Sequence, residues 1–208
     1  MLQTDEIAAF KSLGTGQVSD AMEMLGLRRA VISGFRFVAP PDTNMVGTAL
    51  TIRQAPKHHP AEKSERLVKH GEVAASMAKA GEVIVIDACG RTDIGTWGEN
   101  HSTRCLSRGV AGLLVSGCIR DAASIRKFGF PVFCLGFSPI KSQWDLETVA
   151  INETVTIADV QIRPGDIIFG DEDGVLVIPF DVRAEVLAKA TDIRRREEAD
   201  NPLLTAGR

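Results

Sequence analysis

The chain has 208 residues, a formal net charge of −3 and 44% hydrophobic residues, which predicts one domain over residues 1–208 with a sizeable core. This charge gives no broad electrostatic reason to bind nucleic acid or a membrane. No apolar run approaches the roughly 20 residues of a membrane span, and the opening MLQTDEIAAF holds acids but no apolar signal core. We therefore expect a cytoplasmic enzyme of ordinary composition.

The first third of the chain predicts helices around one strand. Residues 4–25 are broadly helical in pattern, with an interruption at 14–16 whose GTG is no dinucleotide fingerprint, because no strand precedes it. Residues 46–52 predict a strand, residues 56–60 a loop, and residues 61–79 a helix that ends at a glycine.

The middle of the chain alternates between strands and helices. Five elements are predicted there: a β-branched strand at 83–86, a helix at 98–108 closed by Gly109, a strand at 110–116 broken by Gly117, a helix at 122–127 ended by Gly129, and a strand at 132–135. This order implies right-handed crossovers and parallel strands. Ligands of such sheets bind beyond the carboxyl ends of the strands.

The last third predicts strands and a final helix. Residues 149–160 and 166–178 form the predicted strands, with turns at 163–165 and 171–174, and the C-terminal helix covers about 182–199. We therefore expect an α/β domain with a mixed sheet whose central strands are parallel and flanked by helices.

Three sets of side chains suggest metal or redox chemistry only superficially. His58-His59 have no third ligand at motif spacing, the acids at 171–173 lack the downstream spacing of an EF-hand, and Gly174 favours a plain turn. The four cysteines show no CxxC spacing and lie in or beside apolar segments, so they are predicted to be small buried hydrophobes: Cys89, Cys105, Cys118 and Cys134.

The stretch 97–125 carries the most informative pattern. Glu99 lies at the first strand-to-helix junction and Arg120-Asp121 at the second, with twenty residues between Glu99 and Arg120. Two carboxylates and a guanidinium at helix N-termini can hold a divalent cation and an anionic substrate, and the N–H groups at 98–101 would face an anion. The alternative is ordinary: an acid that balances a helix dipole, and a surface ion pair.

The G-E-x-x segment followed by R-D resembles the RraA-like family of 4-hydroxy-4-methyl-2-oxoglutarate aldolases, which also contains the regulator of ribonuclease E activity. The resemblance covers about residues 5 to 200. Its supporting segments are VSDAM at 18–22, GTALTI at 47–52, AGEVIVID at 80–87, RGVAGLLVSGCIRD at 108–121 and GDEDGVLVIP at 170–179. It implies the fold of that family, an α/β/α sandwich.

The resemblance also implies an active site. Asp121 would be the direct protein ligand of Mg²⁺ or Mn²⁺, and Glu99 would hold a water bound to the metal. Arg120 would bind the carboxylate of a pyruvate unit, which its forked guanidinium suits. Backbone N–H groups of Gly98, Glu99, Asn100 and His101 would bind pyruvate oxygens. The implied reaction is class II aldol cleavage to pyruvate, with oxaloacetate decarboxylation as a side activity.

One position departs from the family. Members usually carry apolar residues where this chain has Asn100-His101, which puts the identity of the substrate in doubt. His101 could carry a proton, contact the distal end of the substrate, or be a solvated histidine on a helix.

The resemblance further implies a ring-shaped trimer, sometimes stacked as a hexamer, in which Glu197 or Glu198 of a neighbouring subunit completes the site. The alternative is a regulator that binds a ribonuclease without catalysis. A methyltransferase is not supported, because no strand–GxGxxG–helix is visible.

Overall fold

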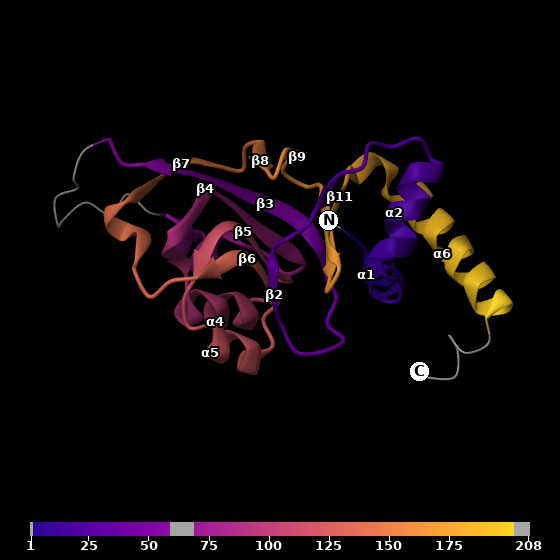
Figure 1. Ribbon diagram of the computed structural model, residues 1–208, viewed down its shortest axis with the longest axis horizontal. Helices are drawn as coiled ribbons and strands as arrows, with labels where there is room; N and C mark the ends of the chain where they lie inside the picture. Colours follow the sequence, from indigo (N-terminus) through magenta and orange to yellow (C-terminus); the bar gives the residue numbers. More distant parts are fainter. Residues whose placement is uncertain (1, 59–68, 202–208) are drawn as a thin grey trace.

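A mixed nine-stranded sheet organises the residues that the computed structural model describes, 2–58 and 69–201 (Figure 1). Its centre is four strands that pair in parallel: β3 (Met45–Pro56), β4 (Glu82–Trp97), β5 (Gly112–Ile119) and β6 (Val132–Phe137). Five antiparallel strands extend or flank this centre: β1 (Val31–Ile32), β2 (Arg36–Val38), β7 (Leu146–Ile151), β10 (Ile167–Asp171) and β11 (Gly174–Ile178). The predicted mixed sheet with parallel central strands is confirmed.

The two faces of the parallel strands are covered differently. In β4 all of Val83–Ile86 is buried, as expected for a strand with both faces covered. Ile84 and Ile86 face the helices α4 (Glu99–Ser107) and α5 (Ala122–Phe128). Val83 and Val85 pack against a small hairpin, β8 (Val155–Ile157) and β9 (Val160–Ile162). In the described residues this hairpin lies where a three-layer sandwich would place helices.

A second group of helices packs on the other end of the same sheet. It consists of α1 (Thr4–Lys11), α2 (Thr15–Met24) and α6 (Arg183–Asp200), which is preceded by the short turn η3 (Phe180–Val182). Figure 1 shows α2 and α6 side by side at the end of the molecule away from α4 and α5. Their core includes Phe10, Phe169 and Val186.

Most predicted helices and strands are confirmed, with shifts at their ends. Gly109 and Gly129 end α4 and α5 in the left-handed region, with φ of 73° and 75°. The prediction that Gly117 breaks its strand is wrong, because β5 continues to Ile119. A Cβ at Gly117 would lie 3.0 Å from Ala88 Cβ, so the glycine permits close packing of the two strands there. Residues 87–97, between the strand predicted at 83–86 and the helix predicted at 98–108, form an irregular extension of β4 with shifts of register against β5.

Three other predictions are only partly met. Of the helix predicted at 61–79, residues 61–68 lie outside the described residues; the rest is a single turn, α3 (His70–Glu72), and a π-helical turn, η1 (Val73–Met77). The predicted strand 149–160 is divided between β7, β8 and the start of β9. Cys105, Cys118 and Cys134 are buried as predicted, but the prediction is wrong for Cys89, which is exposed.

Candidate active site

A cavity of about 320 Å³ lies at the carboxyl ends of the parallel strands. The end of β4, the residue after β5, and a 3₁₀ turn after β6, η2 (Ser142–Trp144), all contribute to it, together with α3 and α4. Its lining residues are His70, Gly71, Gly95, Thr96, Trp97, Gly98, Asn100, His101, Arg120, Lys141, Ser142 and Gln143. The only charged side chains in this lining are two cations, Arg120 and Lys141, apart from histidine, so the cavity suits an anion.

Asp121 adopts a backbone conformation that places its carboxylate away from its own helix. It precedes α5 at the N-cap position, yet its φ and ψ of 59° and 30° are left-handed, and its side chain makes no capping bond to α5. Instead, the Glu99 N–H at the start of α4 donates to Asp121 Oδ2 at 3.3 Å, and Arg120 Nε lies 3.6 Å from the same oxygen. The conformation costs about 1–2 kcal/mol for a residue with a Cβ, and such strain is concentrated at functional sites.

Gly98 allows the two junctions to meet. A Cβ on Gly98 would lie 2.9 Å from Asp121 Oδ2 and 3.1 Å from Arg120 Cγ and Nε. Real Cβ atoms essentially never approach a neighbour as closely as the 2.9 Å to Asp121 Oδ2. The glycine before α4 is therefore a steric requirement for the placement of the Arg120-Asp121 pair.

Two histidines and a tryptophan form one wall of the cavity. The rings of His70 and His101 meet edge to face with centroids 5.0 Å apart, and Trp97 lies 5.2 Å from His101 and 6.0 Å from His70. Burial, and next the charge of His101, lowers the pKa of His70 to about 3. Burial, followed by the positive charges of Arg104 and Arg120, lowers the pKa of His101 to about 4. Both imidazoles are consequently neutral near pH 7.

A chain of buried hydrogen bonds ends on His70. Ser142 Oγ donates to Thr96 Oγ1 at 3.1 Å, and Thr96 Oγ1 donates to Gln54 Oε1 at 2.9 Å. The amide of Gln54 then donates from Nε2 to His70 Nδ1 at 3.0 Å. Since a neutral imidazole carries one proton, acceptance at Nδ1 places the proton of His70 on Nε2.

The residues proposed from the sequence lie together around this cavity. Gly98, Asn100, His101 and Arg120 line it, while Glu99 and Asp121 lie beside it, joined by the bond between them. The expected row of N–H donors at the start of α4 is partly used by the protein, because Glu99 N–H donates to Asp121 and His101 N–H donates to Gly98 O at 3.2 Å. His101 is half-buried in ring contacts, which does not fit a solvated histidine.

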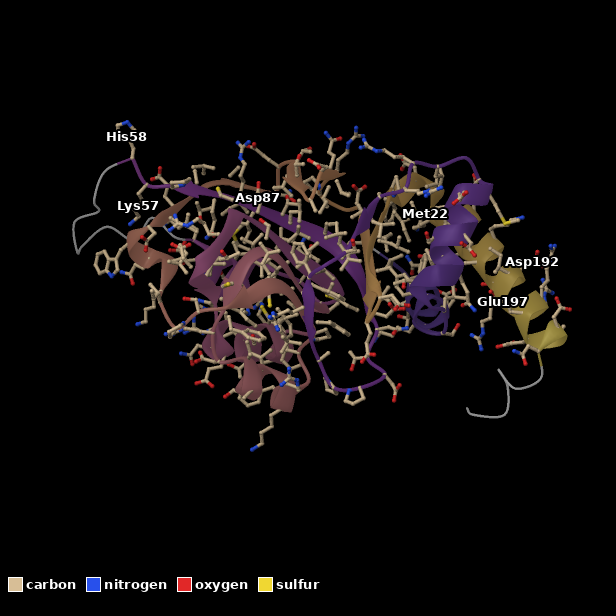
Figure 2. The ribbon with its side chains drawn as sticks, in the orientation of Figure 1. Met22, Lys57, His58, Asp87, Asp192 and Glu197 are labelled. Atoms are coloured by element: carbon tan, nitrogen blue, oxygen red, sulfur yellow. The ribbon has the colours of Figure 1, made fainter. Side chains whose placement is uncertain are left out.

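The C-terminal acids lie at the other end of the same chain. Lys57 Nζ donates to Gln143 O in the cavity lining at 2.6 Å, and Figure 2 shows Lys57 at the opposite end of the molecule from Glu197. Glu197 Oε2 accepts a bond from Gln17 at 2.6 Å, and Glu198 pairs with Arg194 at 2.7 Å. Within one chain these two acids therefore do not reach the cavity.

The sequence pattern named four of the twelve lining residues, Gly98, Asn100, His101 and Arg120. His70, Lys141, Ser142 and Gln143 come from segments that carried no motif. Gln54, which bonds to His70 without lining the cavity, comes from the interior of a strand. Ligands of parallel sheets bind beyond the carboxyl ends of neighbouring strands. That rule points to the segment after β6, because β6 is one of these strands. No comparable signal marked His70, whose helix had been predicted with different bounds.

The donor set at the two junctions fits a hard divalent cation. Asp121 presents its carboxylate beside the cavity, with its side chain 35% exposed, and Glu99 is joined to it through its backbone N–H. Mg²⁺ and Mn²⁺ prefer oxygen ligands, and Mg²⁺ commonly binds through one or two carboxylates with water in other positions. In the part of the chain that is described, no group of three or more His, Cys, Asp or Glu side chains could enclose a metal. His59, one of the paired histidines of the sequence, lies outside that part.

No described helix has the length and apolarity to cross a bilayer.

The fold and site together define an α/β protein with a cationic cavity, bordered by the Asp121 carboxylate, at the carboxyl ends of its parallel strands. The family model RraA-like, described as Aldolase/RraA, matches residues 15–177. The chain therefore belongs to the RraA-like family, as its sequence motifs predicted.

Individual relatives agree with this assignment. The chain is 32% identical over 197 residues to a protein of Halalkalibacterium halodurans named "Putative 4-hydroxy-4-methyl-2-oxoglutarate aldolase", covering 95% of this chain and 87% of that one. It is also 32% identical over 202 residues to protein DlpA of Legionella pneumophila, covering 93% of this chain but only 30% of DlpA, so it spans about a third of that relative.

A solved structure shows the same fold. The protein RraAS2 of Streptomyces coelicolor, described as an unusual member of the RNase ES inhibitor RraA protein family, superposes with a TM-score of 0.82. The identity is 26%, and the match covers 96% of each chain.

Proposed function

We propose that this protein is a divalent-metal-dependent aldolase that cleaves a 4-hydroxy-2-oxo acid to pyruvate. The observation that carries the proposal is the left-handed Asp121, which does not cap its own helix and presents its carboxylate beside Arg120 and the cavity. A purely structural acid at a helix start would be expected to bond its own N–H groups. The aldolase name of a relative that is aligned over most of both chains supports the proposal.

The residues that would hold the cation are Asp121, directly, and Glu99, through water. When bound, the cation supplies Lewis-acid stabilisation of negative charge that develops on the 2-oxo oxygen. Mg²⁺ or Mn²⁺ suits the oxygen donors equally, so both belong in the assay.

Arg120 has the chemistry to orient the substrate. Its guanidinium lines the cavity and is 33% exposed, so it can bind the substrate carboxylate with two parallel hydrogen bonds. In the proposed cleavage the C3–C4 bond breaks, the 4-hydroxyl proton leaves as the distal carbonyl forms, and C3 of the pyruvate unit later gains a proton. Loss of CO₂ from oxaloacetate leaves the same three-carbon unit, so decarboxylation is the proposed side activity.

The natural test is pyruvate release from several 4-hydroxy-2-oxo acids and from oxaloacetate. We expect release with Mg²⁺ or Mn²⁺ and loss of release with a chelator, restored by added metal. No metal-dependent release from any of these substrates would overturn the proposed function.

The second candidate is a regulator that binds a ribonuclease without catalysis, which the likeness to RraAS2 favours. Its expected signature is binding to a ribonuclease E-type enzyme that persists in Asp121→Asn, together with no metal-dependent pyruvate release from the wild type. Release that disappears in Asp121→Asn would instead favour the aldolase.

We also propose the oligomer that the family resemblance implies, a homotrimer or a hexamer in which Glu197 or Glu198 of the partner subunit reaches the cavity. The distance of α6 from the cavity within one chain is consistent with a contribution from a neighbour (Figure 2). Light scattering coupled to size exclusion measures the mass, and a monomer would refute the arrangement.

A further inference from the structure

One wall of the cavity consists of ring side chains that the proposed binding of the pyruvate unit does not use. Arg120 and the carboxylates account for binding of pyruvate, whereas His70, His101 and Trp97 form a separate cluster on the same cavity. His70 is only 6% exposed. Such a buried polar side chain is costly unless its hydrogen bonds are made.

The hydrogen-bond chain fixes which atom of His70 can donate. Gln54 Oε1 accepts from Thr96, so the amide nitrogen of Gln54 faces His70 Nδ1 and must donate to it. Ser142 donates to Thr96 and holds that hydroxyl in its direction. His70 is thus a neutral imidazole with a proton on Nε2, and it can act as a donor from a ring that lines the cavity.

His101 adds an unsatisfied polar atom to the same wall. Among the described residues, His101 Nδ1 is buried and has no hydrogen-bond partner. Its ring is also held closely, since a Cβ on Gly71 would lie 3.0 Å from His101 Cε1. An unsatisfied buried nitrogen costs free energy, and this one, enclosed by the protein, offers no hydrogen bond to a ligand in the cavity.

The charges of the cavity limit what this wall can bind. A second carboxylate placed against two neutral imidazoles and an indole would lose its water without gaining a cation. Lys141 is exposed, so it can neutralise a carboxylate only where solvent also reaches. An uncharged oxygen, by contrast, needs only the donor that His70 supplies.

We propose that His70, with the rings of His101 and Trp97 beside it, binds the distal fragment of the substrate and selects one that carries an uncharged oxygen, such as a hydroxyl group. His70 is then a specificity-determining residue, and Gln54 and Thr96 are positioning residues that act through it. This inference rests on the proposed aldolase function and names its substrate class.

The activity test uses three pyruvate aldol adducts that share the reacting half. The glycolaldehyde adduct ends in a hydroxymethyl group, the propanal adduct replaces that hydroxyl with a methyl group, and the glyoxylate adduct ends in a carboxylate. We expect kcat/KM to be about tenfold higher for the glycolaldehyde adduct than for the propanal adduct, the size of one well-made hydrogen bond. The glyoxylate adduct should be the poorest of the three.

Two histidine replacements localise the preference. His70→Asn keeps an acceptor for Gln54 but lacks the Nε2 donor, so the glycolaldehyde-to-propanal ratio should fall to near one. The control is His58→Asn, the same change at an exposed histidine beyond the end of β3, which should leave the ratio as it is in wild type. Equal losses on both substrates in His70→Asn would assign His70 to the fold alone and overturn the inference, as would a preference for the glyoxylate adduct.

A spectroscopic test does not depend on activity. Nitrogen-15 NMR of the imidazoles, assigned with His70→Asn, should show His70 as the Nε2–H tautomer in wild type. Gln54→Glu replaces the donor to Nδ1 with a carboxylate, so the proton should move to Nδ1, while Gln54→Asn should not produce that shift. An Nδ1–H tautomer in wild type would overturn the inference. If no adduct releases pyruvate, both the proposed aldolase function and the proposed substrate class fail. The tautomer of His70 still shows whether its Nε2 carries the proton that it would donate into the cavity.

Discussion

Asp121 and Asp171 each accept a hydrogen bond from the N-terminus of a helix to which they do not belong, and they differ in how fully they are bonded. Asp171, at the end of β10, accepts from Thr15 N–H at 2.8 Å, from Thr15 Oγ1 at 2.8 Å and from Asp173 N–H at 3.0 Å. Asp121, at the start of α5, has a single bond from Glu99 N–H at 3.3 Å and a 3.6 Å contact with Arg120. The first joins α2 to the sheet, and the second lies beside the cavity.

The difference separates a structural carboxylate from one that can take a ligand. Three short bonds leave Asp171 little capacity for another partner, and its backbone is not in the left-handed region. Asp121 has a strained backbone and weak contacts. The sequence pattern placed Asp121 at a helix start and Asp171 in a turn between strands, so it did not show that both contact the N-terminus of another helix.

The strongest test of the comparison replaces each acid with asparagine. Asp121→Asn keeps the shape and tolerates the left-handed backbone, but removes the charge that would hold the cation; we expect metal-dependent pyruvate release to fall by at least about 100-fold. Asp171→Asn should leave activity unchanged and lower the free energy of unfolding by about 0.5–1.5 kcal/mol, because an NH₂ group that cannot accept replaces one of the two accepting oxygens. Kinetics and urea unfolding on both variants measure the two effects. The opposite pattern would reverse the assignment of the two acids.

Arg120→Lys tests whether the neighbour of Asp121 binds substrate or only balances its charge. Lysine keeps the charge but loses the forked geometry, so pyruvate binding should weaken by about 1–3 kcal/mol, the range for a charge-assisted hydrogen bond. Product inhibition by pyruvate measures this directly. A wild-type inhibition constant in this variant would reduce Arg120 to an ion-pair partner of Asp121.

The sequence predicted the parts of this comparison that depend on local chemistry. Strand patterns placed Glu99 and Asp121 after neighbouring parallel strands, and glycine ends placed α4 and α5 correctly. The left-handed conformation of Asp121 could not be predicted, because an acid at a helix start normally caps that helix. The contribution of His70 and Gln54 was also hidden, since it depends on the irregular end of β4 and on a π-helical turn. Burial of Cys89 was wrongly predicted from its place beside an apolar segment, because its backbone is left-handed, with φ of 58°, and its side chain is exposed.

Acid should destabilise the cavity end of the molecule before the helical end. His70 has a pKa of about 3 in the folded state against an ordinary value of 6.5, so the unfolded chain binds its proton first. The stability that His70 contributes is complete above pH 6.5 and is lost as the pH falls toward 3, by about 1.4 kcal/mol per pH unit. At the helical end, burial raises the pKa of Asp166. The contribution of this carboxyl to stability therefore increases as the pH falls, opposite to that of His70.

Hydrogen exchange between pH 6.5 and 4 measures this contrast. After correction for intrinsic rates, protection of amides in β4 and α4 should decrease with pH more steeply than protection in α2 and α6. His70→Asn should flatten the dependence at the cavity end, because it removes the titrating group and keeps the acceptor for Gln54. If protection decreases equally in all elements, the titration of His70 affects global unfolding and not local opening of the cavity end.

The smallest expected effect comes from glycine at the same two acids. Asp121→Gly removes the left-handed penalty of about 1–2 kcal/mol and adds a glycine entropy cost of about 0.5–1 kcal/mol. The free energy of unfolding should therefore stay the same or rise by up to about 1.5 kcal/mol, while metal-dependent activity is lost. Asp171→Gly pays the entropy cost with no strain to relieve and also loses three bonds, so it should destabilise. Urea unfolding of the two variants gives the comparison. Equal destabilisation would show that Asp121 supports the fold as Asp171 does, whereas a stable but inactive Asp121→Gly would show that its backbone strain is retained for function.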